Sequence, residues 1–175
     1  MTKLRKMLGD INSEECIAMM HLIETQSKTT LASWAVTYVK EHYLTIYEEE
    51  CQGDVRLRDT IAVCEEYLQG DKKLTEVKPI LREAAQIARD ITDNPIAQAA
   101  ARAIATACAV IQTPTNTLGF IFYGAAVTAY SKAGLEETVE IYDELARGEF
   151  KRAYNSLEKV SVPDEANPAK IKWNC

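Results

Sequence analysis

Glycine and proline are scarce in this chain, which has seven glycines and five prolines among 175 residues. These two residues supply most of the tight turns that a many-stranded β fold requires. No pair of alternating apolar segments joined by a two-residue turn occurs, so β-hairpins are not expected. The scarcity of turn formers therefore predicts long helices joined by few connections.

Histidine is rarer still, since His21 and His42 are the only two. Neither has a second histidine at the helical spacing of zinc motifs, and no glycine-rich loop is placed to cradle a phosphate. A serine nucleophile elbow and a readable cysteine–histidine pair are also missing. These absences predict a protein that is not an enzyme and that needs neither a metal nor a cofactor.

The five cysteines are odd in number and form no CxxC pair or zinc-ligand spacing. Cys16, Cys64 and Cys108 lie among apolar residues of predicted helices, where a thiol behaves as a small hydrophobic side chain. This usage is typical of a reducing compartment. No apolar segment follows the basic N-terminal residues, so a secretory signal is not indicated and a cytoplasmic location is expected.

The net charge is −6, with 26 acidic and 20 basic residues. An acidic chain repels phosphate backbones, which disfavours nucleic acid as a partner. The same charge suits a basic protein partner, because complementary potentials speed encounter. Ordinary solubility is the simpler explanation, and composition alone does not choose between them.

Capping and periodicity signals predict seven or eight antiparallel helices in one all-α domain, residues 1–175. Residues 1–11 are expected to form a loose arm, and residues 161–175 an irregular tail anchored by Trp173. Apolar spacing predicts one helix through residues 30–50 and a break or bend at Gly148. The expected caps of the first six helices are Asn12, Thr29 or Thr30, Asp54, Thr75, Asn94 and Thr113.

An alanine-rich segment, residues 95–131, contains a single charged side chain, that of Arg102. Pro114 divides it into two helices. The first is too weakly apolar to enter a membrane, so we expect a central core hairpin and no membrane contact. The aromatic side chains of the second helix need cover from other helices or from a second subunit, which makes a homodimer an open alternative.

Three interpretations of Arg102 stay open. Its long side chain could reach the surface. It could form a buried ion pair with Asp90 or Asp93 across the Asn94–Pro95 turn. It could also bind an anion in a crevice, which would make the protein a small-anion-binding protein.

Two acidic clusters are candidate partner-binding surfaces. Residues 41–54 contain no lysine or arginine, and residues 135–149 contain Arg147 as the only cation. Such clusters are usually solvated faces, and the alternative is a docking surface for a basic protein. The candidate contacts are Glu48, Glu49, Glu50, Asp54, Glu136, Glu137, Glu140, Asp143 and Glu144.

Residues 129–160 (AYSKAGLEETVEIYDELARGEFKRAYNSLEKV) resemble one helical-hairpin repeat of the pentatricopeptide or tetratricopeptide kind. Arrays of such repeats bind RNA or peptides. No repeat period of about 34 residues recurs upstream, and the acidic charge disfavours RNA. A helical-repeat-like scaffold for a protein or peptide is therefore an alternative function.

A wider resemblance covers roughly residues 31–133. Trp34-Ala35, DVRLRDTIAVCEEYLQG (54–70), REAAQIARD (82–90), NPIAQAAARAIATACAVIQTPT (94–115) and YGAAVTAY (123–130) occur in that order. This order resembles the all-α immunity proteins of bacterial polymorphic toxin systems. It is similar to an immunity family with an R-x-R-x-A-I-like helix ending in glycine, followed by an A-A-R-A helix. The matching residues are Arg56, Arg58, Gly70, Ala101, Arg102 and Ala103.

The resemblance implies an immunity protein that neutralises a cognate toxin domain by stoichiometric binding in the cytoplasm. The acidic clusters suit a basic toxin. The family pattern has histidines after the A-R-A segment, where this chain has Cys108 and Gln112. No role that depends on those histidines is therefore transferred.

Overall fold

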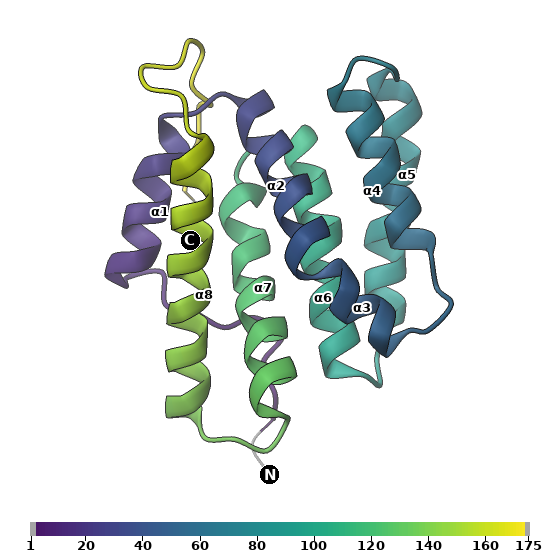
Figure 1. Cartoon of the computed structure of the whole chain (residues 1–175), viewed down its shortest axis with the longest axis vertical. Coiled ribbons are helices and arrows are strands. Elements are labelled where there is room, and N and C mark those ends of the chain that lie inside the picture. The colour runs from purple at the N-terminus through teal and green to yellow at the C-terminus, as the bar shows by residue number, and fades with distance from the viewer. Residues whose placement is uncertain (1–2, 174–175) are drawn as a thin grey trace.

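The computed structural model describes residues 3–173, which contain eight α-helices (Figure 1). An isolated bridge between Ser27 and Pro168 is the only strand-like pairing in that range. The prediction of an all-α array of seven to eight helices is confirmed. The helices are α1 (Glu14–Glu24), α2 (Lys28–His42), α3 (Leu44–Glu50), α4 (Arg56–Leu68), α5 (Leu74–Asp90), α6 (Pro95–Cys108), α7 (Asn116–Ala133) and α8 (Val139–Val160), with a 3₁₀ turn, η1 (Ala109–Ile111), after α6.

The alanine-rich pair α6 and α7 lies in the middle of the array, with α8 and α1 on one side and α4 and α5 on the other (Figure 1). Nine of the 14 residues of α6 are buried, and seven of these nine are alanines. Alanine adds little bulk, so neighbouring helices pack closely against α6 and leave few voids. Among residues 3–173, no helix is long and apolar enough to cross a membrane.

The aromatic side chains of α7 are covered by the chain itself. Phe120 and Tyr130 are buried in the core. Phe122 packs edge-on against Phe150 of α8, with ring centroids 5.0 Å apart. Of the two sources of cover considered for this face, other helices and a second subunit, the chain itself supplies it through α2, α8 and the N-terminal arm.

Tyr43 interrupts the helix expected through residues 30–50, which is two helices, α2 and α3. Its backbone has φ −117° and ψ −28°, away from regular helix values. Its ring is fully buried and turned toward Gly124 of α7, where an added Cβ would lie 2.0 Å from the Tyr43 hydroxyl. Tertiary packing of one side chain thus overrides the helical periodicity.

Gly148 neither breaks nor bends the last helix, so the expectation of two helices there was wrong. One helix, α8, runs from Val139 to Val160. Buried side chains on both sides of Gly148, among them Ala146 and Phe150, hold one continuous face on the core. Burial of that face outweighs the roughly 1 kcal/mol by which glycine disfavours a helix relative to alanine.

The helix caps were only partly predicted. Asn94 caps α6 as expected, since its Oδ1 accepts a hydrogen bond from the Ala97 amide at 3.1 Å. Serine hydroxyls cap α1 and α2 in place of Asn12 and of Thr29 or Thr30, through Ser13 and Ser27. Other starts also shift by a residue or more: α4 begins after Val55, α5 after Lys73, and α7 after Thr115 rather than Thr113.

The N-terminal arm has no helix but is held in place, so it is not loose. The Leu8 amide donates to the Phe122 carbonyl at 3.1 Å, and the Tyr130 hydroxyl donates to the Arg5 carbonyl at 2.6 Å. Gly9 has φ +122° and lies directly on the Phe150 ring, where an added Cβ would be 2.6 Å from the ring. The arm therefore acts as a strap across α7 and α8.

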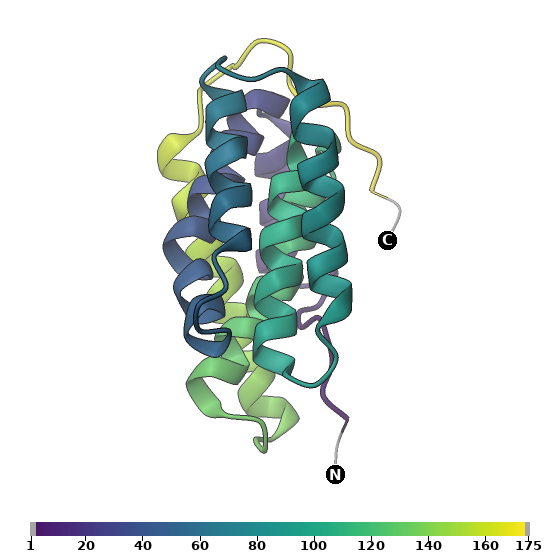
Figure 2. The same cartoon turned by 90° about the vertical axis from the view of Figure 1, so that its right-hand side faces the viewer.

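The C-terminal tail is irregular within the described residues and lies across the α1–α2 turn (Figure 2). Buried Gln26 holds it at two points. Its side-chain Oε1 accepts the Val162 amide at 2.8 Å, and its backbone carbonyl accepts the Ala169 amide at 2.8 Å. Trp173 donates its indole N–H to Glu24 of α1, which is the anchoring role expected of it. Cys175 lies outside the described residues.

Candidate partner-binding surface

The first acidic cluster, residues 41–54, is largely neutralised by residues outside it. Arg58 donates its Nε to Glu48 Oε2 at 2.9 Å, and Arg56 donates its Nη2 to Asp54 Oδ2 at 2.8 Å. Glu50 accepts the Asn94 side-chain amide at 2.9 Å. Both arginines begin α4, which folds back beside α3. Of the candidate contacts predicted here, Glu49 is left as the exposed carboxylate without such a partner.

Asp54 is the most strongly perturbed acid of this cluster. Hydrogen bonds from the Arg56 guanidinium, and a further one from the Tyr47 hydroxyl at 2.6 Å, hold the pKa of Asp54 well below its usual range. The folded state therefore favours the ionised carboxylate more than the unfolded state does. This stabilisation is fully present above the unfolded pKa of about 3.9 and is lost as pH falls below it.

We therefore expect Asp54→Asn to lower the free energy of unfolding near neutral pH. The difference in this free energy between the variant and the wild type should become smaller at acidic pH. Urea unfolding at pH 6 and at pH 2.5 measures both quantities. Asp71→Asn serves as the control, because Asp71 is exposed and forms no ion pair among the described residues. If the difference in unfolding free energy between variant and wild type were the same at both pH values, Asp54 would stabilise the fold through its shape rather than its charge.

The second acidic cluster forms an exposed surface at the turn between α7 and α8. Among residues 3–173, none of its five predicted carboxylates forms an ion pair, and all five are exposed. Three exposed apolar side chains lie between them: Leu135 at 40%, Val139 at 53% and Ile141 at 39% exposure. We call residues 135–144 the acidic turn. Its carboxylates are Glu136, Glu137, Glu140, Asp143 and Glu144.

The backbone of the acidic turn is fixed by hydrogen bonds. Gly134 adopts φ +82°, a left-handed conformation that ends α7. The buried Tyr142 hydroxyl donates to the Gly134 carbonyl at 2.6 Å and accepts the Glu137 amide at 3.1 Å. Thr138 caps α8 by accepting the Ile141 amide at 3.3 Å. The carboxylates are thus carried on a rigid support, which lowers the entropy lost when a partner binds.

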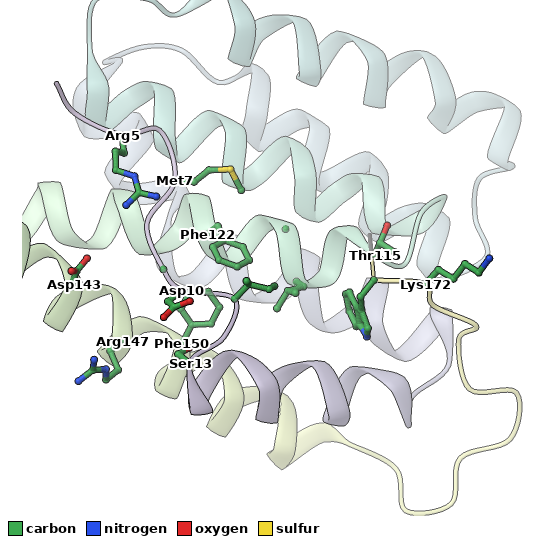
Figure 3. A pocket seen from close by; sticks show the side chains of 15 residues that line it. Arg5, Met7, Asp10, Ser13, Thr115, Phe122, Asp143, Arg147, Phe150 and Lys172 are labelled. Carbon is green, nitrogen blue, oxygen red and sulfur yellow. The ribbon is translucent and has the colours of Figure 1, made fainter. Parts of the chain in front are cut away.

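A hollow of about 870 Å³ adjoins the acidic turn. Figure 3 shows Asp143 and Arg147 at one end of it, Lys172 at the other, and Phe122 and Phe150 between them. The N-terminal arm, α7, α8 and the tail form its walls. An apolar floor inside a charged rim is the arrangement that receives an anchoring side chain of a protein partner.

Glu149, counted with the second cluster from sequence, does not belong to that surface. It is buried at 2% exposure and accepts hydrogen bonds from Tyr38 at 2.8 Å and from Tyr43. Arg152 donates its Nη2 to Glu149 at 2.7 Å and its Nε to the Tyr38 hydroxyl at 3.1 Å. Burial and the neighbouring carboxylate raise the pKa of the Tyr43 hydroxyl well above its usual value.

The signal for this buried network was in the sequence. Glu149 is in helical phase with Tyr142, Ala146 and Ala153, which are all buried. A carboxylate on an apolar stripe indicates a buried group that requires partners. A count of charges along the chain does not take into account which face of the helix each residue occupies, so it placed Glu149 in the acidic cluster.

Arg102 is half-buried on α6, and its Nε is enclosed without a hydrogen-bond partner. Within residues 3–173 it forms no ion pair, so the pairing with Asp90 or Asp93, one of the three interpretations left open, is not seen. Asp90 instead accepts a hydrogen bond from Gln86 at 2.7 Å. Arg102 does not line the hollow beside the acidic turn. The groove between α2 and α8 does not include Arg102 either, and anion binding by Arg102 stays a hypothesis.

The surroundings of Cys108 and His42 change the pKa of both side chains. Cys108 is fully buried, and a hydrogen bond with Cys64 together with burial raises the pKa of its thiol well above the usual value. A thiol that stays protonated is a poor nucleophile. Burial lowers the pKa of His42, with the nearby Arg152 acting in the same direction. Among the residues described, no group of three or more metal-ligating side chains is assembled.

Comparison with known proteins places the chain beside a family of known description. A family model described as "Imm-5 like putative immunity protein" matches residues 21–153. These residues run from α1 into the second half of α8 and include the acidic turn. No curated protein and no solved structure matches the chain significantly.

Proposed function

The chain belongs to the family of Imm-5 like putative immunity proteins, and from this premise we propose that it binds and neutralises a cognate toxin protein. Neutralisation is stoichiometric and non-enzymatic, and it needs no cofactor. The setting is the cytoplasm of a bacterium that carries a polymorphic toxin system. Nucleic acid and membrane are not partners in this proposal.

The acidic turn is the surface that supports the proposal best. It combines five carboxylates that form no ion pair with any described residue, three exposed apolar side chains and an adjoining hollow. Protein interfaces place apolar anchors at the centre and charged groups at the rim. The carboxylates would steer a basic toxin surface, and the apolar side chains would be buried once it docks.

The first acidic cluster is a weaker candidate. Its arginine-paired carboxylates already have partners, so a toxin arginine would have to displace Arg56 or Arg58 to reach Asp54 or Glu48. A peptide-binding scaffold built on residues 129–160 is the second candidate function. It is favoured by a groove of about 1000 Å³ beside α8, on the side of the helix that faces α2.

Co-expression tests the proposal. The C-terminal domain of the toxin encoded beside this chain would be produced with and without it, and growth and co-purification would be recorded. Rescue of growth together with a complex of equal stoichiometry is expected. Rescue without a complex would contradict stoichiometric neutralisation, and a complex without rescue would contradict neutralisation itself.

We expect Glu136→Lys, Glu137→Lys and Glu140→Lys together to weaken toxin binding by about a hundred-fold or more, because attraction becomes repulsion at three positions. Isothermal titration at low and moderate salt measures the dissociation constant and its salt dependence. The matched control is Asp71→Lys, Glu83→Lys and Asp93→Lys, three exposed acids outside both acidic clusters. Equal losses in both triple variants would show a net-charge effect and would remove the acidic turn from the proposal.

A further inference from the structure

A polar groove of about 1000 Å³ lies between α2 and α8. One wall carries hydroxyl side chains of α2, including Thr29, Ser33 and Thr37. The facing wall carries the cations Lys151, Arg152 and Lys159 of α8, against Glu41 as the acid of the lining. This groove is therefore locally basic on a chain whose net charge is −6.

The exposed face of α8 is divided by charge. Its first half carries Glu140, Asp143 and Glu144 against Arg147, which lies 3.8 Å from Glu15 of α1, and its second half carries mainly cations, including Lys151. Helix dipoles favour this order of charges, but their effect is confined to the first and last turns. Glu144 and Lys151 lie further inside the helix than that, so the dipole does not account for them.

Gly148 lies between the two halves, and an added Cβ there would meet nothing within 4 Å. It is exposed in the middle of a 22-residue helix. No contact with residues 3–173 requires a glycine at this position, although alanine would favour the helix. A residue without a side chain at the midpoint of an exposed helix permits another helix to cross closely at that point.

We propose that two copies of this chain pair through their α8 helices, antiparallel about a two-fold axis at Gly148. Residues at equal distances before and after the axis then face each other. Glu144, four residues before Gly148, faces Arg152, four residues after it, in the second copy. The acidic half of each helix lies against the basic groove of the other, so one self-complementary surface forms every contact twice.

Hydrogen bonds within the chain already hold the Arg152 guanidinium in position for this contact. Its Nη2 is held by Glu149 at 2.7 Å and its Nε by the Tyr38 hydroxyl at 3.1 Å, while 40% of the side chain stays exposed. A guanidinium fixed on one edge can donate from the other without losing rotamer freedom. Ile141, which is 39% exposed, lies one turn before Glu144 and would be covered by the second copy.

The pairing goes beyond the proposed function, since it requires no toxin. It occupies Glu140 and Glu144, which belong to the acidic turn, so self-association and toxin binding would compete for that part of the surface. Sedimentation of the isolated chain tests the pairing separately. A toxin that failed to bind would leave this result unchanged.

Sedimentation equilibrium of the full chain at low salt should show a monomer–dimer equilibrium that weakens as salt is added. We expect Glu144→Lys to weaken dimerisation about ten-fold or more, because it places a lysine against Arg152 of the second copy twice. Lys151→Glu should also weaken dimerisation, because it removes positive charge from the groove that receives the acidic half of the other helix. Glu83→Lys and Lys78→Glu on α5, on the other side of the molecule from α8, are the matched controls (Figure 2).

Gly148→Gln separates dimerisation from folding. Glutamine should stabilise the helix of the monomer, since nothing crowds position 148, yet its side chain would block the crossing of two helices. A variant with a higher melting temperature and at least a ten-fold weaker dimer is expected. A wild type that stays monomeric at every concentration, a dimer indifferent to Gly148→Gln, or a dimer that Glu144→Lys does not weaken would each overturn the proposal.

Discussion

Gly124→Ala should destabilise the protein by about 2–3 kcal/mol, although it adds a single methyl group to a helix. The added Cβ would lie 2.0 Å from the Tyr43 hydroxyl and 2.4 Å from the ring carbon that carries it. Tyr43 cannot easily retreat, because its ring is fully buried and its hydroxyl is bound to Glu149. The loss should therefore exceed the gain that alanine brings to an unstrained helix.

Urea unfolding followed by far-UV circular dichroism measures this loss. Gly119→Ala on the same helix is the control, because its Cβ would meet the Thr106 methyl group at an ordinary 3.7 Å. That control should be neutral or stabilising. Equal stabilities for the two variants would mean that Tyr43 does not hold the position described here.

Glu149→Ala should cost about 3–5 kcal/mol, which is the loss expected when one partner of a buried charge pair is removed. The substitution leaves the hydroxyls of Tyr38 and Tyr43 without their acceptor. It also leaves Arg152 without its counter-charge. The three donors, Tyr38 of α2, Tyr43 at the α2–α3 junction and Arg152 of α8, would therefore all lose the acceptor that they share.

Glu149→Gln distinguishes charge from hydrogen bonding, since the amide keeps one acceptor oxygen but loses the negative charge. Glu149→Gln should destabilise the protein relative to the wild type, but by less than Glu149→Ala does. Glu83→Ala on α5 is the surface control, with an expected change within about 0.5 kcal/mol. Glu149→Leu would contradict the account if it matched wild type, because a leucine cannot satisfy Arg152.

The fold class could be predicted from sequence because it depends on local signals. Scarce turn formers, helical spacing of apolar residues and the Asn94–Pro95 start act over a few residues. The errors arose where distant residues decide the outcome. Tyr43 ends α2 because of a glycine on α7, and burial of residues on both sides of Gly148 keeps α8 continuous.

The candidate surface was predicted by the same local reasoning, with the same limit. The carboxylates of the acidic turn are exposed, as a run of charges at a helix start suggests. The first cluster was judged without Arg56 and Arg58, which follow it in sequence and fold back on it. Which acids keep their charge available for a partner depends on pairing between helices, and a linear count of charges does not contain that information.

The hydrogen bonds between Gln26 and the C-terminal tail can form only at a late stage of synthesis of the chain. The Gln26 side chain is bound by Val162, 136 residues later, which supplies a donor and an acceptor. Until residues 162–169 have left the ribosome, the α1–α2 turn lacks the hydrogen bonds that Val162 and Ala169 supply to Gln26. Contacts of such long separation form late in folding. A nascent chain stalled before this segment should therefore expose the α1–α2 turn to proteases that the finished protein resists.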